Sequence, residues 1–525
     1  MAKNESRLRR VRKIGLVLGP VLFAMTIFAS PIDEVLTFGA VVVLATVFWM
    51  AAWWVTEALP IYVTALLPLV IFPSLGVTDI GGTSINYADP IVFLFLGGFL
   101  LAKAIEKAGL HRRFALTILQ SFGTNPKYIV AAFMIVTGFL SAWMSNTATT
   151  LLMLPIALAV ISQLSTSMSD ASKRDRFATC LMLAVAYSAS IGGMATLIGT
   201  PPNAIFASLS QSVAGVNVSF TSWMLVAMPI SATLLFVAWW YLVNLGSKVT
   251  DIPPITKEKD LVKKQLTGLG NMDRNEKMVL AVFAATAIAW ITRGLLWKDI
   301  FPLIDDSVIA ITAAISLFVL PSLRHSENAG KREPDISPHD TDTTRTDDEN
   351  ELDEKAGKAE GDDAKHGALL DWQTAVKIPW GVLLLIGGGI ALANGFTATG
   401  LDDWIAGQLG FLGGMHYIFI ILILVAVTVI AGEVISNTAT AALLIPISAS
   451  LATSLGVSPI LLMAPVAIAA SIGFIMPVGT PPNAIVFASG HITAAKMARA
   501  GIPLDLISIV IVTLLASALV PLVWG

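Results

Sequence analysis

Long apolar runs, broken at a few places by short polar motifs, dominate the chain. Runs long enough to cross roughly 30 Å of hydrocarbon lie at residues 14–30, 37–56, 61–75, 90–107, 177–198, 220–245, 277–296, 306–321, 376–394, 460–478 and 503–523. They predict an all-α polytopic membrane protein with about eleven transmembrane helices. The first run follows a basic cluster, as a signal peptide does, but Pro31 occupies the expected cleavage position. We therefore interpret it as a retained helix.

Two further apolar stretches, residues 127–163 and 415–455, carry polar residues at their middles. If each enters and leaves on one side as a re-entrant hairpin, the basic groups at residues 103–113, 173–176, 248–264, 324 and 496–499 all fall on the cytoplasmic side. That arrangement satisfies the positive-inside rule. It predicts a cytoplasmic N-terminus and an external C-terminus.

The segment 325–367 is rich in Asp, Glu, Thr, Lys and Gly, with almost no large apolar residue. Such a composition buries too little surface to offset its ordering entropy, so we expect a disordered acidic cytoplasmic loop. We interpret it as a solvated linker, and a regulatory segment is the alternative. The chain then divides into N-terminal helices (1–85), a first repeat (86–250), two linking helices (251–324), the loop, and a second repeat (368–525).

Composition supports the membrane interpretation. Of 525 residues, 55% are hydrophobic and 13% charged, with a mean hydropathy of +0.77, whereas soluble domains carry about 25% charged residues. A net charge of −3 argues against a nucleic-acid partner. Cys180 is the sole cysteine, which excludes an intrachain disulfide or a cysteine cluster. The six histidines lack metal-ligand spacing, and no nucleophile with a base falls in the spans, so we do not expect an enzyme.

Two motifs occur twice in the same order. Ser-Asn-Thr-Ala-Thr occupies 145–149 and 436–440, and Gly-Thr-Pro-Pro-Asn-Ala-Ile occupies 199–205 and 479–485, each pair preceded by Gly-Gly at 97–98 and 387–388. Such duplication indicates structural repeats. Because the two hairpins enter from opposite sides, the repeats are predicted to be inverted, an arrangement typical of transporters with a site near the bilayer midplane.

The repeated motifs contain the groups needed to bind an anion together with a cation. Proline and glycine break a helix, which exposes carbonyl oxygens for a cation and N–H groups at the new helix start for an anion. Ser, Asn and Thr side chains add neutral donors and acceptors, and Ser141 lies one turn before Ser145. Neither motif pair contains Lys or Arg, so anion binding should depend on a bound cation.

Structural explanations exist for each motif alone, since Ser and Thr often bond their own backbone and proline kinks are common. The ordered duplication favours a binding site. Glu433, beside the second motif, and Glu57, near a helix end, are candidates for coupling because intramembrane carboxylates are usually functional. Either could instead be interfacial or bonded to backbone.

The motifs, together with Trp-Trp-Val-Thr-Glu-Ala-Leu-Pro at 53–60, resemble the divalent anion–sodium symporter family of dicarboxylate, citrate and sulfate carriers. The resemblance covers nearly the whole membrane part. It implies a homodimer with a scaffold domain and a transport domain that moves as an elevator. It also implies substrate contacts from Asn146, Thr147, Thr200, Asn437, Thr438 and Thr480.

The same resemblance implies two sodium sites. The first would use Ser141, Ser145, Asn146 and Gly199, and the second would use backbone of Ile435 and Gly479 with the Asn437 side chain. Gly432 departs from the family, whose members often have threonine there. One side-chain oxygen is therefore missing, and the second cation site is expected to be weaker, formed by backbone alone, or absent.

The function expected from these features is secondary active symport of C4-type dicarboxylates (succinate, malate, fumarate) with co-transported Na⁺ across the plasma or inner membrane, with no organic cofactor. The alternatives are a sodium-independent exchanger, a carrier of sulfate or citrate, and an anion channel.

Overall fold

A computed structural model describes residues 2–30, 36–167, 170–252, 258–297, 299–322, 367–409 and 414–525. Within these ranges the chain is helical, with one isolated bridge between Pro321 and Ala368 and no strand. The all-α prediction is thereby confirmed. The predicted acidic loop lies outside the described residues except for Gly367.

The α-helices are α1 (Ala2–Ala29), α2 (Phe38–Thr56), α3 (Ile61–Thr64), α4 (Leu67–Ser74), α5 (Ile80–Ser84), α6 (Pro90–Ala108), α7 (Leu110–Ser121), α8 (Pro126–Ser141), α9 (Asn146–Ser167), α10 (Ala171–Gly193), α11 (Pro201–Ala214), α12 (Phe220–Tyr241), α13 (Glu258–Gly268), α14 (Arg274–Thr292), α15 (Asp306–Val319), α17 (Trp372–Ala375), α18 (Trp380–Thr399), α19 (Leu401–Leu409), α20 (Tyr417–Gly432), α21 (Asn437–Ser454), α22 (Ile460–Ala469), α23 (Pro481–Ala488) and α24 (Ala494–Trp524). Short 3₁₀ or π turns follow α5, α12 and α14.

Eight helical stretches in the described part are long and apolar enough to cross a membrane, and each coincides with a predicted crossing. The other predicted crossings, 61–75, 306–321 and 460–478, fall on shorter apolar helices. At about 1.5 Å per residue, a 14-residue helix such as α15 covers about 21 Å. In the third of these segments the helix α22 ends at Ala469, and non-helical chain leads from there to the second Gly-Thr-Pro-Pro-Asn motif at 479.

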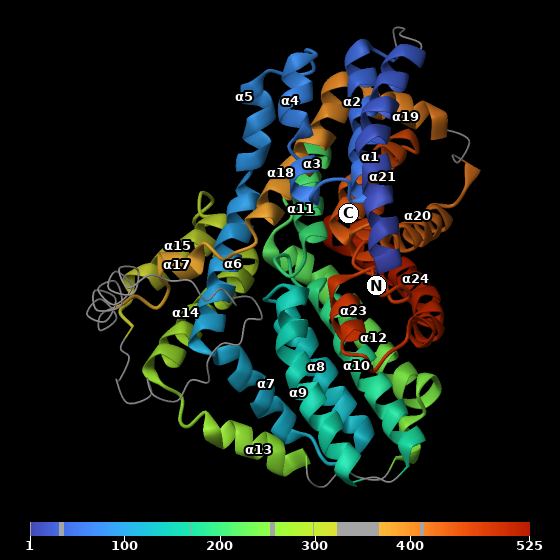
Figure 1. Ribbon diagram of the computed structural model, residues 1–525. Helices are drawn as coiled ribbons and strands as arrows, with labels where there is room; N and C mark the ends of the chain where they lie inside the picture. Colours follow the sequence, from blue (N-terminus) through green and yellow to red (C-terminus); the bar gives the residue numbers. More distant parts are fainter. Residues whose placement is uncertain are drawn as a thin grey trace, which may run out of the picture.

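Each predicted re-entrant stretch is a helical hairpin. The helices α8 and α9 meet at the first Ser-Asn-Thr motif, and α20 and α21 meet at the second. In Figure 1, α8 and α9 run side by side toward the end where α7 and α13 lie, while α21 lies in the opposite half with α19. The helices α9 and α21 therefore lie in opposite halves of the molecule, and the inversion of the repeats stays a prediction.

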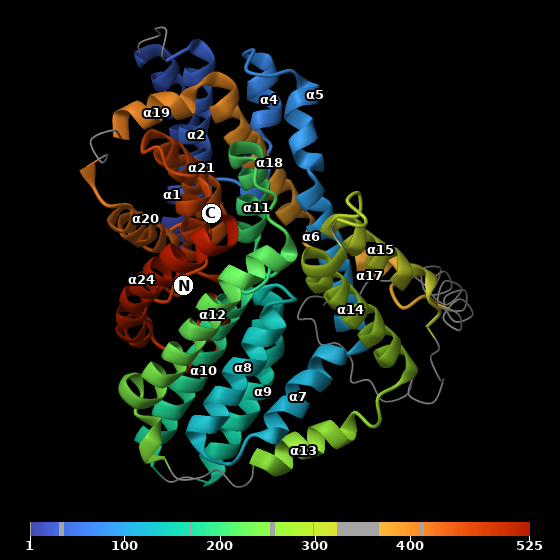
Figure 2. The ribbon, with the colours of Figure 1, turned by 180° about the vertical axis from the view of Figure 1, so that it is seen from behind.

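Two amphipathic helices, α7 and α13, lie at the lower end of the molecule in Figures 1 and 2. Helix α7 packs against α13 there. Arg113 of α7 donates to Glu276 at the start of α14 (2.9 Å), and both side chains are largely buried. Glu276 also forms a capping box with Asp273. A single ion pair thus ties α7 to the start of α14.

An aromatic cluster fixes the turn of the first hairpin. The Trp143 ring stacks on Phe220 of α12 at a centroid distance of 5.8 Å and meets Phe283 of α14 edge-on at 4.8 Å. Phe220 in turn stacks on Trp290 at 4.6 Å. Aromatic pairs contribute about 0.5–1.5 kcal/mol beyond their buried area, so this cluster positions the polar motif that begins two residues after Trp143.

Candidate functional site

The first hairpin turn meets the first helix break. The Ser141 hydroxyl lies 2.7 Å from Oδ1 of Asn146 and 2.7 Å from the Ala189 carbonyl oxygen on α10. A Cβ atom on Gly193, where α10 ends, would collide with Asn146 Oδ1. Because a hydroxyl has one proton, it donates to only one of these oxygens at a time. Three oxygens are thus gathered with a single proton among them.

A hydroxyl joins this turn to the break itself. Thr196, in the segment between α10 and α11, donates its Oγ1 proton to the Ala142 carbonyl oxygen. Gly199 lies against Gly193 so closely that a Cβ atom on Gly199 would collide with the Gly193 carbonyl oxygen. The predicted ligands Ser141, Asn146 and Gly199 therefore lie in one connected cluster.

In the second repeat, a carboxylate connects the hairpin turn to the helix break. Glu433, at the position that Ala142 holds in the first repeat, accepts hydrogen bonds from the backbone N–H groups of Ile475 (2.9 Å) and Met476 (2.7 Å). It also approaches Gly479, whose Cβ, if present, would lie 3.1 Å from Glu433 Oε2. The sequence left Glu433 as either an interfacial side chain or one bonded to backbone, and the structure shows that it is bonded to backbone. Coupling stays a separate prediction.

One asparagine in each break makes the same hydrogen bonds. Nδ2 of Asn203 donates to the carbonyl oxygens of Gly193 (3.2 Å) and Thr196 (2.7 Å). Nδ2 of Asn483 donates to those of Gly473 (2.9 Å) and Met476 (3.0 Å). In both cases the acceptors lie ten and seven residues earlier, so the two breaks share one geometry.

Sequence reasoning did not assign a role to these two asparagines. They stand inside the repeated Gly-Thr-Pro-Pro-Asn-Ala-Ile string, so the signal was present, but the proline and glycine content alone accounted for the break. Both residues are fully buried. Their amides satisfy carbonyl groups that the interruption leaves without helical partners.

Four helices begin at the motifs. These are α9 at Asn146, α11 at Pro201, α21 at Asn437 and α23 at Pro481. Helix α9 packs against α23, and α21 packs against α11, so each hairpin helix contacts a half-helix of the other repeat. Unpaired N–H groups in the first turn give each helix start a partial positive charge. In the first repeat, the contacts of Gly193 with Asn146 and Asn203 also bring the starts of α9 and α11 close together.

The remaining predicted residues occupy these helix starts. Ser145 caps α9 by accepting from the N–H of Ala148 (3.2 Å), and Ser436 caps α21 in the same way. Thr480 accepts from the N–H of Asn483 (3.3 Å), whereas Thr200 makes no such cap. Thr147 and Thr438 lie in the first turns of α9 and α21, and Ile435 lies in the turn between α20 and α21.

Gly432 has a direct structural consequence. In the first repeat, Ser141 contacts Asn146 Oδ1. In the second repeat, the residue at the position of Ser141 is Gly432, and Oδ1 of Asn437 is buried without a hydrogen-bond partner in the described residues. The missing hydroxyl predicted from the sequence therefore leaves one amide oxygen free to accept from another group.

The two sides of the site differ in exposure. Leu151 on α9 is 54% exposed and Phe487 on α23 is 39% exposed. Their equivalents by motif position, Ala442 on α21 and Ala207 on α11, are 0% and 5% exposed. The half-helices that run toward the α7–α13 end therefore carry an uncovered face, while those of the opposite half are covered.

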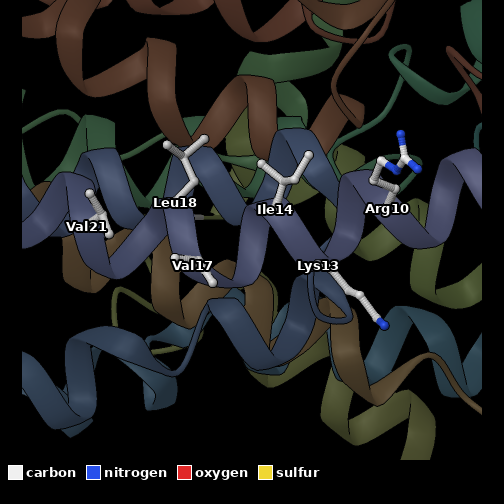
Figure 3. A pocket seen from close by; sticks show the side chains of 6 residues that line it. All are labelled: Arg10, Lys13, Ile14, Val17, Leu18 and Val21. Atoms are coloured by element: carbon white, nitrogen blue, oxygen red, sulfur yellow. The ribbon is translucent and has the colours of Figure 1, made fainter.

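Two other sequence features lie away from this site. Glu57 is exposed and pairs with Arg12 (3.2 Å), which supports its interfacial interpretation. A shallow groove on α1 is lined by Arg10, Lys13, Ile14, Val17, Leu18 and Val21. Figure 3 shows the two basic side chains at one end of that groove and the aliphatic ones along the rest. No residue of either motif lines it.

Comparison with known proteins identifies the chain's relatives. Residues 12–524 match the family described as the sodium:sulfate symporter transmembrane region. The chain is 39% identical over 529 residues to the sodium-dependent dicarboxylate transporter SdcS of Staphylococcus saprophyticus, covering 100% of this chain and 94% of that protein. It is also 39% identical to the transporter of the same name from Staphylococcus aureus strain USA300, over 98% of this chain and 92% of that protein.

A solved structure shares the fold. The YdaH transporter of Alcanivorax borkumensis superposes with a TM-score of 0.53 at 12% identity, covering 90% of this chain and 98% of that one. At this identity the likeness concerns the fold alone. Since one family accounts for almost the whole length, the chain is an integral membrane transporter rather than an enzyme, and it belongs to the sodium:sulfate symporter family.

Proposed function

We propose that this protein is a secondary active transporter that imports C4-type dicarboxylates such as succinate, malate or fumarate together with Na⁺. The observation that carries the proposal is the oxygen cluster at the first hairpin turn, which lies beside helix starts that offer N–H groups. The relatives of this chain are named sodium-dependent dicarboxylate transporters, which supports the same substrate class.

The first oxygen cluster has the chemistry of a sodium site. Ser141, Asn146 and the Ala189 carbonyl bring three oxygens together with one proton among them, and hard cations prefer oxygen ligands. Ser145 and Gly199 complete the proposed set. In the second repeat, the free Oδ1 of Asn437 would act with backbone of Ile435 and Gly479.

The dianion would lie between the helix starts. Its carboxylates would accept from Thr147, Thr200, Thr438 and Thr480 and from the amides of Asn146 and Asn437. Helix ends alone contribute modest stabilisation. Sodium binding would therefore supply most of the positive charge, and substrate affinity should rise with sodium concentration.

The uneven exposure of the half-helices supports a site that moves: α9 and α23 carry an uncovered face, whereas α11 and α21 are covered. The uncovered face of α9 and α23 supports a state in which the site communicates with the side that we assign to the cytoplasm from the basic loops. We propose that the second state is reached by an elevator movement of the repeats against the remaining helices, within a homodimer.

The test is uptake of labelled succinate into proteoliposomes with Na⁺ or choline outside. Saturable uptake that needs Na⁺ is expected. Equal uptake in both media would contradict sodium coupling and favour exchange, preference for sulfate or citrate would change the substrate, and unsaturable conductance would indicate a channel.

The site assignment is tested with Asn146→Ala and Asn437→Ala in the same assay. Each variant should fold, as judged by monodisperse elution in detergent, and lose most sodium-dependent uptake. Normal transport by both folded variants would contradict the assignment.

A further inference from the structure

A buried tyrosine of the first repeat bonds to the break of the second repeat. Tyr187 lies on α10 and is 0% exposed. Its hydroxyl donates to the carbonyl oxygen of Phe474 (2.8 Å), in the non-helical segment between α22 and α23. The two rings also lie against each other at a centroid distance of 4.7 Å. Among the described residues, no second donor bonds this carbonyl oxygen, so the first repeat satisfies a backbone group of the second break.

The corresponding carbonyl group of the first break is bonded in the same manner. Met194 corresponds to Phe474, since each lies six residues before the threonine of its Gly-Thr-Pro-Pro-Asn motif. The Met194 carbonyl oxygen accepts from Nε1 of Trp223 on α12 (3.0 Å), which is fully buried. In the second repeat, Ala467 holds the position of Tyr187 and offers no side-chain donor. Both breaks therefore depend on an aromatic donor that belongs to the first repeat.

Helix α24 also lies against this carbonyl group. A Cβ atom on Gly501 of α24 would collide with the Phe474 carbonyl oxygen. The helix can therefore come this close only because residue 501 has no side chain. Since α24 contributes no donor to the Phe474 carbonyl oxygen in the described residues, the hydrogen bond comes from Tyr187.

The same turn of α10 contacts the first oxygen cluster. Ala189, two residues after Tyr187, accepts the hydrogen bond from the Ser141 hydroxyl with its carbonyl oxygen (2.7 Å). The residues of α10 from 177 to 193 are all buried, and the helix packs against α8, α9 and α23. One rigid helical turn thus contacts the first hairpin turn and the second break.

We infer that Tyr187 is a positioning residue that holds the second break in place from the first repeat. Its hydrogen bond fixes the Phe474 carbonyl group, and the segment that follows leads to Gly479, a proposed sodium ligand. A buried carbonyl group without a donor is unfavourable, so loss of the hydroxyl should let this segment shift. The link to sodium affinity rests on the proposed function.

Hydrogen–deuterium exchange, followed by mass spectrometry of peptides, tests the position of the break and needs no transport activity. Tyr187→Phe keeps the ring and removes only the hydroxyl. Peptides that cover residues 470–480 should exchange about fivefold faster than in wild type, because the break opens more often when its carbonyl group lacks a donor. Tyr241→Phe is the matched control, since that hydroxyl donates to the Arg499 carbonyl oxygen on α24 (3.4 Å). It should leave exchange of these peptides unchanged.

Succinate uptake measures the consequence for sodium. Tyr187→Phe should raise the half-saturating sodium concentration about fivefold, while the maximal rate stays within about twofold of wild type. A general loss of structure would instead lower the maximal rate and leave the sodium dependence unchanged. Tyr241→Phe should match wild type in both quantities.

Gly501→Ala reaches the same carbonyl group from the other helix. Its Cβ would displace the Phe474 carbonyl oxygen, so it should raise both exchange and half-saturating sodium, and it decides the matter if Tyr187→Phe does not fold. Unchanged exchange in Tyr187→Phe would overturn the inference, as would faster exchange with an unchanged sodium dependence. If wild-type uptake is independent of sodium, the proposed function fails, and the exchange result alone decides the role of Tyr187.

Discussion

The asparagines of the two breaks illustrate how much depends on single side chains. Asn203 and Asn483 are buried, and each amide bonds two carbonyl groups that no helix satisfies. Prolines and glycine determine that the helices break. The asparagine amide determines the shape of the break, because it holds both carbonyl groups in one arrangement.

We expect Asn203→Ala and Asn483→Ala to abolish sodium-dependent uptake and to lower stability by about 1–3 kcal/mol, the cost of leaving buried carbonyls unsatisfied. Thermal unfolding in detergent and succinate uptake measure the two effects. Asn244→Ala is the control, since that amide bonds only the Trp240 carbonyl of its own helix. Wild-type behaviour of both break variants would show that the prolines alone shape the breaks.

Gly432 offers a second test on single residues. A Cβ atom there would lie 3.2 Å from the Ile472 carbonyl oxygen, so a small side chain fits after a slight adjustment. Gly432→Ser supplies the hydroxyl that Ser141 provides in the first repeat, and Gly432→Ala supplies the same bulk without it. The half-saturating sodium concentration of the serine variant should be about threefold lower than that of the alanine variant. Equal values would show that Asn437 Oδ1 does not bind the cation.

Among helices, a largely buried ion pair joins α7 to α14. Arg113 and Glu276 are about a tenth exposed, and Arg113 also donates to the Gly270 carbonyl oxygen (2.8 Å). Breaking a buried pair by removing one partner leaves the other charge without compensation. The amphipathic helix α7 therefore depends on this arginine for its position at the end of the molecule.

Arg113→Met should lower the free energy of unfolding by about 3–5 kcal/mol, seen as a lower thermal midpoint in detergent. Arg112→Met is the matched control because Arg112 is exposed, and it should shift the midpoint little. A similar shift in both variants would mean that charge near α7, rather than the pair with Glu276, determines its stability.

At the scale of the whole molecule, the two repeats share their motifs but not their exposure. Leu151 and Phe487 are uncovered, while Ala442 and Ala207 are covered. The shared motifs by themselves do not determine this difference. It arises because the repeats are placed differently against the other helices, and α18 covers α11 and α21.

Cysteine labelling tests this asymmetry. Cys180 is fully buried, so wild type gives a low background. Leu151→Cys and Phe487→Cys should react with a membrane-impermeant maleimide added to the side on which the α7–α13 end lies. Ala442→Cys and Ala207→Cys, the controls by motif position, should react slowly. No labelling of Leu151→Cys from either side would place this face against lipid.

Much of the fold followed from the sequence. Apolar run length predicted the helices, and the duplicated Gly-Thr-Pro-Pro-Asn and Ser-Asn-Thr strings located the breaks and hairpin turns that the structure contains. The same strings gave the family, which the match over residues 12–524 confirmed. The substrate and sodium residues were proposed from that resemblance and stay predictions.

The sequence by itself determined where helices form, where they break and that two halves repeat, because hydrophobicity, proline and glycine act on neighbouring residues. Tertiary structure decided which groups meet. Glu433 finds its N–H partners 42 and 43 residues away. Such contacts depend on how helices pack, and no local pattern in the chain encodes them.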